Sequence, residues 1–374
     1  MNAIPSTSFH IAVMPGDGIG HEVMAPCIEV VEEAVRRAGN FAMRFEWLEA
    51  GADAYVATGS AMSKATFDAA ARADAILLGA MGLPHIRYPD GTEIAPQLDL
   101  RFDLDLYAGV RPIRTIPGVS SVLRDPRAEK IDLVIIREST EGLFASRGRG
   151  TIEEDREARE TMVITRGVCE RLFDFSLRLG QRRRASGVGQ GRVTCVDKAN
   201  VFTSFAFFRK IFDERARAFP DLLADHVYID ASALMLVLKP WEFDVMVTEN
   251  MFGDILSDLG AGLVGGMGYA PSADVGDTHA VFQPCHGSAP DIAGQGKANP
   301  TAMFLSAAMM LDWLGERHEV ASARKAAALI EGAVDAAFGT GRLVTCERGG
   351  EAGTSAVARA VLEAMAFVST EDRP

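Results

Sequence analysis

Residues 249–268 read ENMFGDILSDLGAGLVGGMG. Asp254 and Asp258 are four positions apart, so a helix through this stretch places both carboxylates on one face, one turn apart. Mg²⁺ binds one or two protein carboxylates and takes its other ligands from water and substrate oxygens. Acidic residues also complement the dipole at a helix N-terminus without binding an ion. The pair alone therefore leaves both interpretations open.

Length and composition predict a large, acidic, globular protein. The chain has 374 residues, 48% of them apolar, which indicates two domains or one large α/β unit. No apolar run is long enough to span a bilayer, so we expect no membrane association. The net charge of −13 argues against a nucleic-acid partner.

The cysteines and the N-terminal residues favour a cytoplasmic protein. Five cysteines are scattered without CxxC spacing, which argues against a disulfide framework or a zinc site. The first twenty residues lack a basic segment followed by an apolar one, so we expect no signal peptide.

Short apolar runs alternate with helical patterns along the chain. Strands are expected at 11–14, 75–79, 131–136, 193–196 and 245–248, with helices between them. This alternation predicts an α/β fold with a mostly parallel sheet. The Gly-x-Gly-x-Gly turn at 16–20 departs from the dinucleotide fingerprint, and a tight turn explains its glycines equally well.

Several charged residues lie near the ends of these elements. Arg101, Arg111 and Arg137 could converge on a carboxylate, which the planar guanidinium binds with two hydrogen bonds. Lys198 follows a strand and precedes an apolar helix, where it is a candidate base or an ordinary helix-start residue. Asp230 follows a further strand at 227–229. The loop 286–294, HGSAPDIAG, could turn backbone N–H groups toward phosphates.

In this order, the motifs resemble the metal-dependent β-decarboxylating dehydrogenases of the isocitrate and isopropylmalate dehydrogenase family. The resemblance covers nearly the whole chain, and residues 250–268 and 286–294 carry its most specific parts. It implies a two-domain fold that is not a Rossmann fold. The large domain would comprise 1–106 and 265–374, and the small central domain 107–264. It also implies a homodimer with a dimerisation arm at about 144–192 and active sites shared between subunits.

The same resemblance assigns roles to individual residues. The three arginines would bind the substrate carboxylates, Lys198 and Asp230 would be catalytic and contributed across the dimer, and Mg²⁺ or Mn²⁺ would bind Asp230, Asp254 and Asp258. Asp291 would favour NAD over NADP, because its charge repels a 2′-phosphate. The full set of expected NAD-binding residues is His286, Gly287, Ser288, Ala289, Asp291, Ile292 and Asn299.

The implied reaction is oxidation of a malate-type 2-hydroxy diacid, as in 3-isopropylmalate dehydrogenases, with loss of CO₂ from the β-carboxylate. Two departures from the family bear on it. Phe144 stands where the family usually has the Tyr that protonates the enolate, so oxidation without decarboxylation is an alternative. Gln283 stands where the family mostly has Glu.

Substrate choice stays open at this stage. In the family, residues just before the first of the three arginines select the substrate. Residues 94–98 here match neither the residues typical of 3-isopropylmalate dehydrogenases nor those typical of isocitrate dehydrogenases. Dehydrogenases of D-malate, tartrate, isocitrate or homoisocitrate are therefore alternatives. A different class, a non-catalytic ligand-binding subunit, has weaker support, because all the expected metal ligands and the lysine are present.

Overall fold

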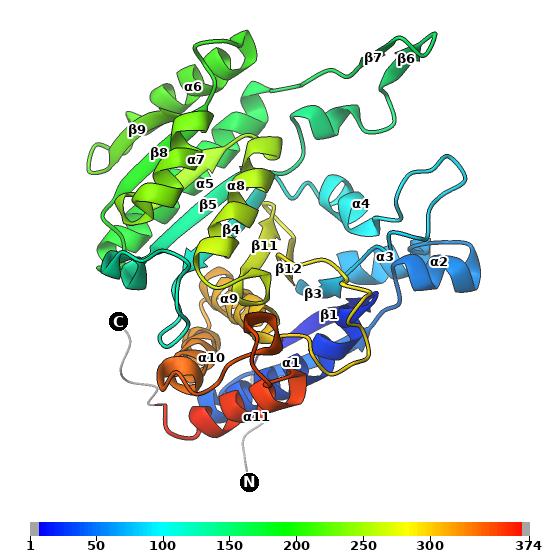
Figure 1. The fold of residues 1–374 in the computed structure, drawn as a ribbon, viewed down its shortest axis with the longest axis vertical. Coiled ribbons are helices and arrows are strands. Elements are labelled where there is room, and N and C mark those ends of the chain that lie inside the picture. Colours follow the sequence, from blue (N-terminus) through cyan, green and yellow to red (C-terminus); the bar gives the residue numbers. More distant parts are fainter. Residues whose placement is uncertain (1–6, 369–374) are drawn as a thin grey trace.

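The computed structural model describes residues 7–368, which are built around one sheet of ten strands (Figure 1). Its inner strands are apolar runs, because helices cover both faces of the sheet. From one edge to the other the strands are β2 (Ala42–Trp47), β1 (Ser8–Gly16), β3 (Ala75–Ala80), β12 (Ala280–Pro284), β11 (Pro271–Val275), β4 (Ala108–Arg114), β5 (Asp132–Glu138), β10 (Val245–Thr248), β8 (Arg192–Asp197) and β9 (Leu223–Tyr228).

The sheet is mostly parallel, as the alternation of strands and helices predicted. The antiparallel neighbours lie at its centre, where β11 pairs with both β12 and β4, and β4 pairs with β5. The other neighbours pair in parallel. This order differs from that of a doubly wound dinucleotide-binding sheet. The α/β prediction without a Rossmann fold is confirmed.

The two halves of the sheet come from different parts of the chain. Strands β1, β2, β3, β11 and β12 come from the two ends of the chain, and the other five come from its middle. The halves meet where β11 pairs with β4. The proposed boundaries at 106/107 and 264/265 fall in loops next to this junction and stay a prediction.

Helices cover the two faces of each half of the sheet (Figure 1). One face of the half formed by the chain ends is covered by α1 (Ile19–Ala38), α9 (Thr301–Arg317), α10 (Ala321–Gly339) and α11 (Thr354–Met365), and the other by α3 (Lys64–Ala71) and α4 (Pro96–Asp103). The short α2 (Ala52–Thr58) packs against the loops before α3 and after β3. Against the middle half pack α5 (Arg166–Ala185) and α6 (Thr203–Ala216) on one face, and α7 (Ile229–Leu238) and α8 (Asn250–Leu263) on the other. No helix in the described part of the chain is long and apolar enough to cross a membrane.

A small hairpin projects from the middle half (Figure 1). It consists of β6 (Thr151–Glu153) and β7 (Glu157–Arg159), whose residues are all exposed. Helix α5 lies in the same predicted arm segment, but it buries Leu172, Phe173 and Leu177 against the sheet. The projecting part is therefore shorter than the segment 144–192.

Candidate active site

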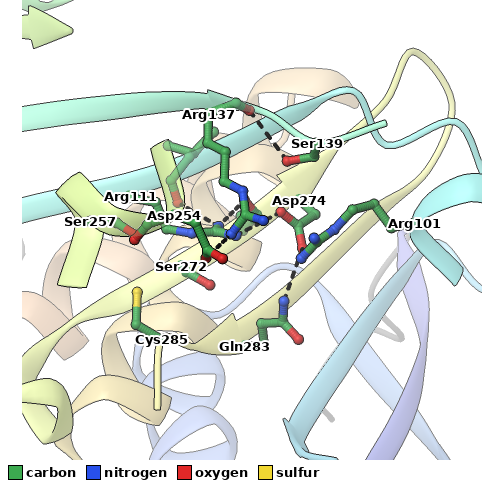
Figure 2. A network of polar contacts seen from close by, with 12 residues as sticks. Arg101, Arg111, Arg137, Ser139, Asp254, Ser257, Ser272, Asp274, Gln283 and Cys285 are labelled. Carbon is green, nitrogen blue, oxygen red and sulfur yellow. Dashed lines mark hydrogen bonds and ion pairs between the residues drawn. The ribbon is translucent and has the colours of Figure 1, made fainter. Parts of the chain in front are cut away.

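Three arginines converge on one cavity of about 240 Å³. Arg101 comes from α4, Arg111 from β4, and Arg137 from the end of β5. All three side chains are almost fully buried, although they line the cavity. The sheet brings them together because β4 and β5 are neighbours, and α4 leads directly into β4 (Figure 2).

Close packing of α8 on β5 fixes the position of Arg137. A Cβ atom at Gly253 would lie 2.6 Å from the Arg137 Cβ, so glycine allows this approach. Arg137 Nε and Nη2 donate to Asn250 Oδ1 at 2.9 and 2.7 Å, and Nη1 donates to Asp254. Burial, and then the neighbouring Arg101, lower the pKa of Arg137 to about 10, so it remains protonated at neutral pH.

Helix α8 presents Asp254 and Asp258 to the cavity, as the four-residue spacing predicted. Its N-terminus is capped by Glu249, which accepts hydrogen bonds from the N–H groups of Met251 and Phe252. The pKa of Asp258 is raised, first by partial burial and then by the charge of Asp254. Paired carboxylates that repel each other suit a hard divalent cation.

Lys198 and Asp230 lie outside this cavity. Lys198 Nζ is paired with Asp230 Oδ1, and neither residue lines the cavity. The hydrogen bond from Lys198 lowers the pKa of Asp230. Among residues 7–368, no three His, Cys, Asp or Glu side chains are grouped so that they could hold a metal ion. Within one chain the predicted metal set is therefore divided into the pair on α8 and the separate Asp230.

The loop 286–294 lies beside the glycine-rich turn that precedes α1. Ile19 N donates to Ser288 O at 2.8 Å. Gly18 has φ +56°, and a Cβ atom there would lie 2.1 Å from Ser288 O. Residues 16–20 therefore form a tight turn, which was one of the two interpretations of their glycines. This turn packs against the loop 286–294.

Glu22 of α1 holds the far end of this loop. Its carboxylate accepts hydrogen bonds from Gly294 N at 3.1 Å, from Ala298 N at 2.9 Å and from the Thr354 hydroxyl. Sequence analysis did not select Glu22, although it follows the glycine-rich turn closely. The carboxylate joins the loop to two helices from opposite ends of the chain.

The predicted NAD-binding residues differ in their surroundings. His286 and Gly287 line the arginine cavity, whereas Asp291 is exposed. Burial lowers the pKa of His286, which favours the neutral ring. Asn299 is buried, and its side chain donates to Glu347 Oε2 at 3.2 Å and accepts from the Thr301 hydroxyl at 2.7 Å.

Asp274 of β11 is part of the site, but sequence analysis did not select it. Its side chain is 3% exposed, and it accepts one hydrogen bond from Arg101 Nη2 and one from Arg111 Nη2, each 2.9 Å long. The sequence did contain a signal for Asp274. It is the one charged residue in the apolar strand PSADV, and a buried carboxylate needs a cationic partner. The partners could not be identified from the sequence, since they lie more than 160 positions away.

Phe144 also lines the cavity, and its ring centroid lies 5.2 Å from Arg137 Cζ. Within residues 7–368, three buried polar atoms of cavity residues have no hydrogen-bond partner, namely Arg101 Nε, Gln97 Oε1 and His286 Nε2. Buried polar groups in native proteins are nearly always satisfied. The cavity is therefore suited to a polar ligand that supplies the missing partners, and its arginines favour an anion.

The fold and this arginine- and aspartate-lined cavity define an α/β protein with a site suited to small anionic molecules. The family model for isocitrate/isopropylmalate dehydrogenase matches residues 10–361, and the chain belongs to this family, as its motifs predicted.

Curated relatives agree with this assignment. The chain is 42% identical to the 3-isopropylmalate/3-methylmalate dehydrogenase of Methanocaldococcus jannaschii, over 94% of this chain and 97% of that protein. It is 40% identical to the 3-isopropylmalate dehydrogenase of Shouchella clausii, over 97% and 99% of the two chains.

Solved structures share the fold. Isocitrate dehydrogenase from Methylococcus capsulatus superposes with a TM-score of 0.82 at 35% identity, covering 96% of this chain and 99% of that chain. A β-decarboxylating dehydrogenase from Thermococcus kodakarensis gives 0.77 at 35% identity, covering 96% of each chain.

Proposed function

We propose that the protein oxidises a malate-type 2-hydroxy diacid with NAD and a divalent cation, and that decarboxylation follows. The observation that carries this proposal is the convergence of Arg101, Arg111 and Arg137 with Asp254 and Asp258 on one cavity. The arginines supply donors for two carboxylates, and the aspartates supply oxygen ligands beside them. The curated relatives named above act on 3-substituted malates, which supports the same substrate class.

Asp254 and Asp258 would hold Mg²⁺ or Mn²⁺, together with Asp230 of the partner subunit. Such a cation, when bound, lowers the pKa of a hydroxyl group and stabilises negative charge on an enolate. Arg137 donates to Asp254, and so holds that carboxylate at the edge of the cavity. The same arginine would orient the substrate carboxylate that lies next to the reacting carbon.

Proton transfer would fall to Lys198 of the partner subunit. As the C2–H hydride passes to NAD, the amine would take the proton of the 2-hydroxyl, directly or through water. The pair with Asp230 holds the Lys198 side chain in one position, and the lysine must release its own proton before its amine can take the proton of the 2-hydroxyl. The loop 286–294 would bind the adenosine half of NAD, and the exposed Asp291 would disfavour a 2′-phosphate.

An exposed apolar face supports the dimer that this arrangement needs. On α7, Asp230, Leu234 and Leu238 follow one another at four-residue spacing, so they share a face, and both leucines are about 60% exposed. Ile255 of α8, next to Asp254, is 61% exposed. If these faces of two subunits pack around a two-fold axis, Asp230 and Lys198 of each subunit approach the α8 carboxylates of the other.

Completion of the reaction after decarboxylation needs a proton donor for the enolate, and Phe144 has no proton to donate. After CO₂ leaves, an acid must protonate the enolate carbon, and we propose that water or Lys198 of the partner subunit does so. The alternative is oxidation without decarboxylation. Replacing Phe144 with Tyr should raise the rate of CO₂ release if protonation limits it; an unchanged CO₂ yield removes the basis for the alternative.

One assay tests the proposed function. The purified protein is incubated with NAD, Mn²⁺ and each of 3-isopropylmalate, D-malate, tartrate, 3-methylmalate, isocitrate and homoisocitrate, and NADH and CO₂ are measured together. We expect equal yields of both products on one 3-substituted or unsubstituted malate. NADH without CO₂ would favour the non-decarboxylating reaction. No NADH from any of these acids would contradict the proposal.

A further inference from the structure

A buried carboxylate lies behind the arginines of the active-site cavity. Asp274 does not line the cavity, yet its two oxygens accept hydrogen bonds from Arg101 and Arg111, which do. Gln283, on the neighbouring strand β12, donates from Nε2 to Asp274 Oδ2 at 2.9 Å. Figure 2 shows Asp274 between Arg101 on one side and the other two arginines on the other. Two of the three arginines are thus paired from inside the protein.

Asp274 is ionised in this position. Burial by itself would raise its pKa, but Arg101, Arg111 and Arg137 together lower it below the ordinary value. His286 and Cys285, which also line the cavity, add no charge, because burial lowers the pKa of His286 and raises that of Cys285 to about 11. Asp274 therefore contributes a full negative charge at neutral pH.

This charge sets the electrostatic balance of the cavity. The charged side chains that line it are the three arginines, Asp254 and Asp258, which leave one positive charge in excess. Asp274 cancels that excess, and the ion pair of Lys198 and Asp230 that the partner subunit would add carries no net charge. A divalent cation on the α8 carboxylates would therefore bring the total to two positive charges. Two carboxylates on a substrate match this total, whereas a third would leave a negative charge uncompensated in a largely buried site.

We propose that Asp274 is a specificity-determining residue, which makes the site select 2-hydroxy diacids over tricarboxylic acids. The inference rests on the proposed function and narrows its substrates to acids with two carboxylates. Asp274 acts through Arg101 and Arg111 because it occupies their inner N–H groups and reduces the positive charge that they present. The Nε of Arg101, which is buried without a partner, remains available to a substrate carboxylate.

The test compares a diacid with a triacid. 3-Methylmalate and isocitrate share the malate unit, but the 3-substituent of isocitrate carries a third carboxylate. Their dissociation constants for the whole protein in saturating Mg²⁺ are measured by calorimetry, with correction for chelation. We expect the wild type to bind the diacid at least about tenfold more tightly. In Asp274→Asn, the ratio should move toward the triacid by about ten- to a hundredfold, since one nearby charge is removed.

A matched control and a charge relocation separate specificity from stability. Asp244→Asn alters another buried aspartate that is paired with an arginine, Arg183, outside the cavity, and it should leave the ratio unchanged. Asp274→Asn combined with Gln283→Glu returns a carboxylate to the same arginines and should restore the preference for the diacid. General loosening of the site would instead weaken both acids alike.

The outcomes distinguish this inference from the proposed function. If the wild type binds 3-methylmalate and isocitrate equally well, the inference is wrong whatever the variants do. If Asp274→Asn folds and its ratio stays within about twofold of the wild type, Asp274 does not set specificity, while the proposed function stands. A wild type that binds neither these acids nor the others assayed above would overturn both.

Discussion

Shared active sites make a sharp prediction about mixed dimers. Lys198 is paired with Asp230 and does not line the cavity that holds Asp254. If each site takes its lysine from the partner, then Asp254→Asn and Lys198→Met damage opposite sides of the same site. Either variant alone should lose metal-dependent turnover. A dimer that contains one chain of each kind should regain one intact site.

The size of the recovery follows from symmetry. Random pairing of two chains gives mixed dimers in about half of the molecules, and each would have one intact site out of two. The mixture should therefore recover about a quarter of the wild-type activity. Neither substitution should prevent folding, because Asp254 is 49% exposed and its partner Arg137 keeps two hydrogen bonds to Asn250, while Lys198 is paired with the exposed Asp230.

The two chains are co-expressed with different affinity tags, and the mixed dimers are isolated through both tags in sequence. Initial rates of NADH formation are measured with saturating Mn²⁺ and the best substrate from the assay above. The purified mixed dimer should show about half of the wild-type rate per dimer. The matched control pairs Asp254→Asn with Asp258→Asn, which should recover nothing, since both changes affect the same side of every site.

Inactive mixed dimers would refute the reasoning, provided that the wild type is active under the same conditions. That result would mean that Lys198 acts within its own chain after a rearrangement, or does not act at all. Recovery in the control pair would also refute it, because Asp254 and Asp258 would then not serve one cavity.

Three further changes test the packing and the electrostatics. Leu234→Glu on the exposed face of α7 should dissociate the dimer, seen as a halved mass by sedimentation, whereas a charge at the remote exposed Val56 should not. Gly253→Ala should lower the free energy of unfolding in urea by about 1–3 kcal/mol and raise KM, because its Cβ would meet Arg137; an unchanged KM would contradict this. Alkylation of Cys285 should accelerate about tenfold per pH unit up to about pH 11, since its raised pKa leaves little thiolate at neutral pH; a plateau near pH 9 would contradict burial of the thiol.

The sequence predicted the local parts of this protein well. The four-residue spacing of Asp254 and Asp258 requires only a helix, and α8 forms as expected because its pattern and its Glu249 cap are contained within the same segment. Strand β10 matches its predicted bounds, since an apolar run between polar residues identifies a buried strand. Helix α7 was not predicted, because its apolar residues occupy both the buried and the exposed face.

The roles carried over from the family remain predictions for Lys198, Asp230 and the cofactor loop. One chain brings together the arginines and the α8 carboxylates, but it leaves the lysine pair outside the cavity. No pattern along the chain could separate these two groups, because the separation depends on which elements face each other and which face outward.

The sequence by itself determined the α/β class, the carboxylate pair on α8 and the family, because short-range periodicity and ordered motifs are properties of the chain alone. Only the tertiary structure decided that Asp274 pairs with Arg101 and Arg111. Their meeting depends on the strand order that puts β11 beside β4, and on packing that excludes water from all three side chains. The physical reason is that such a buried charge network forms between distant segments, whose proximity no local spacing encodes.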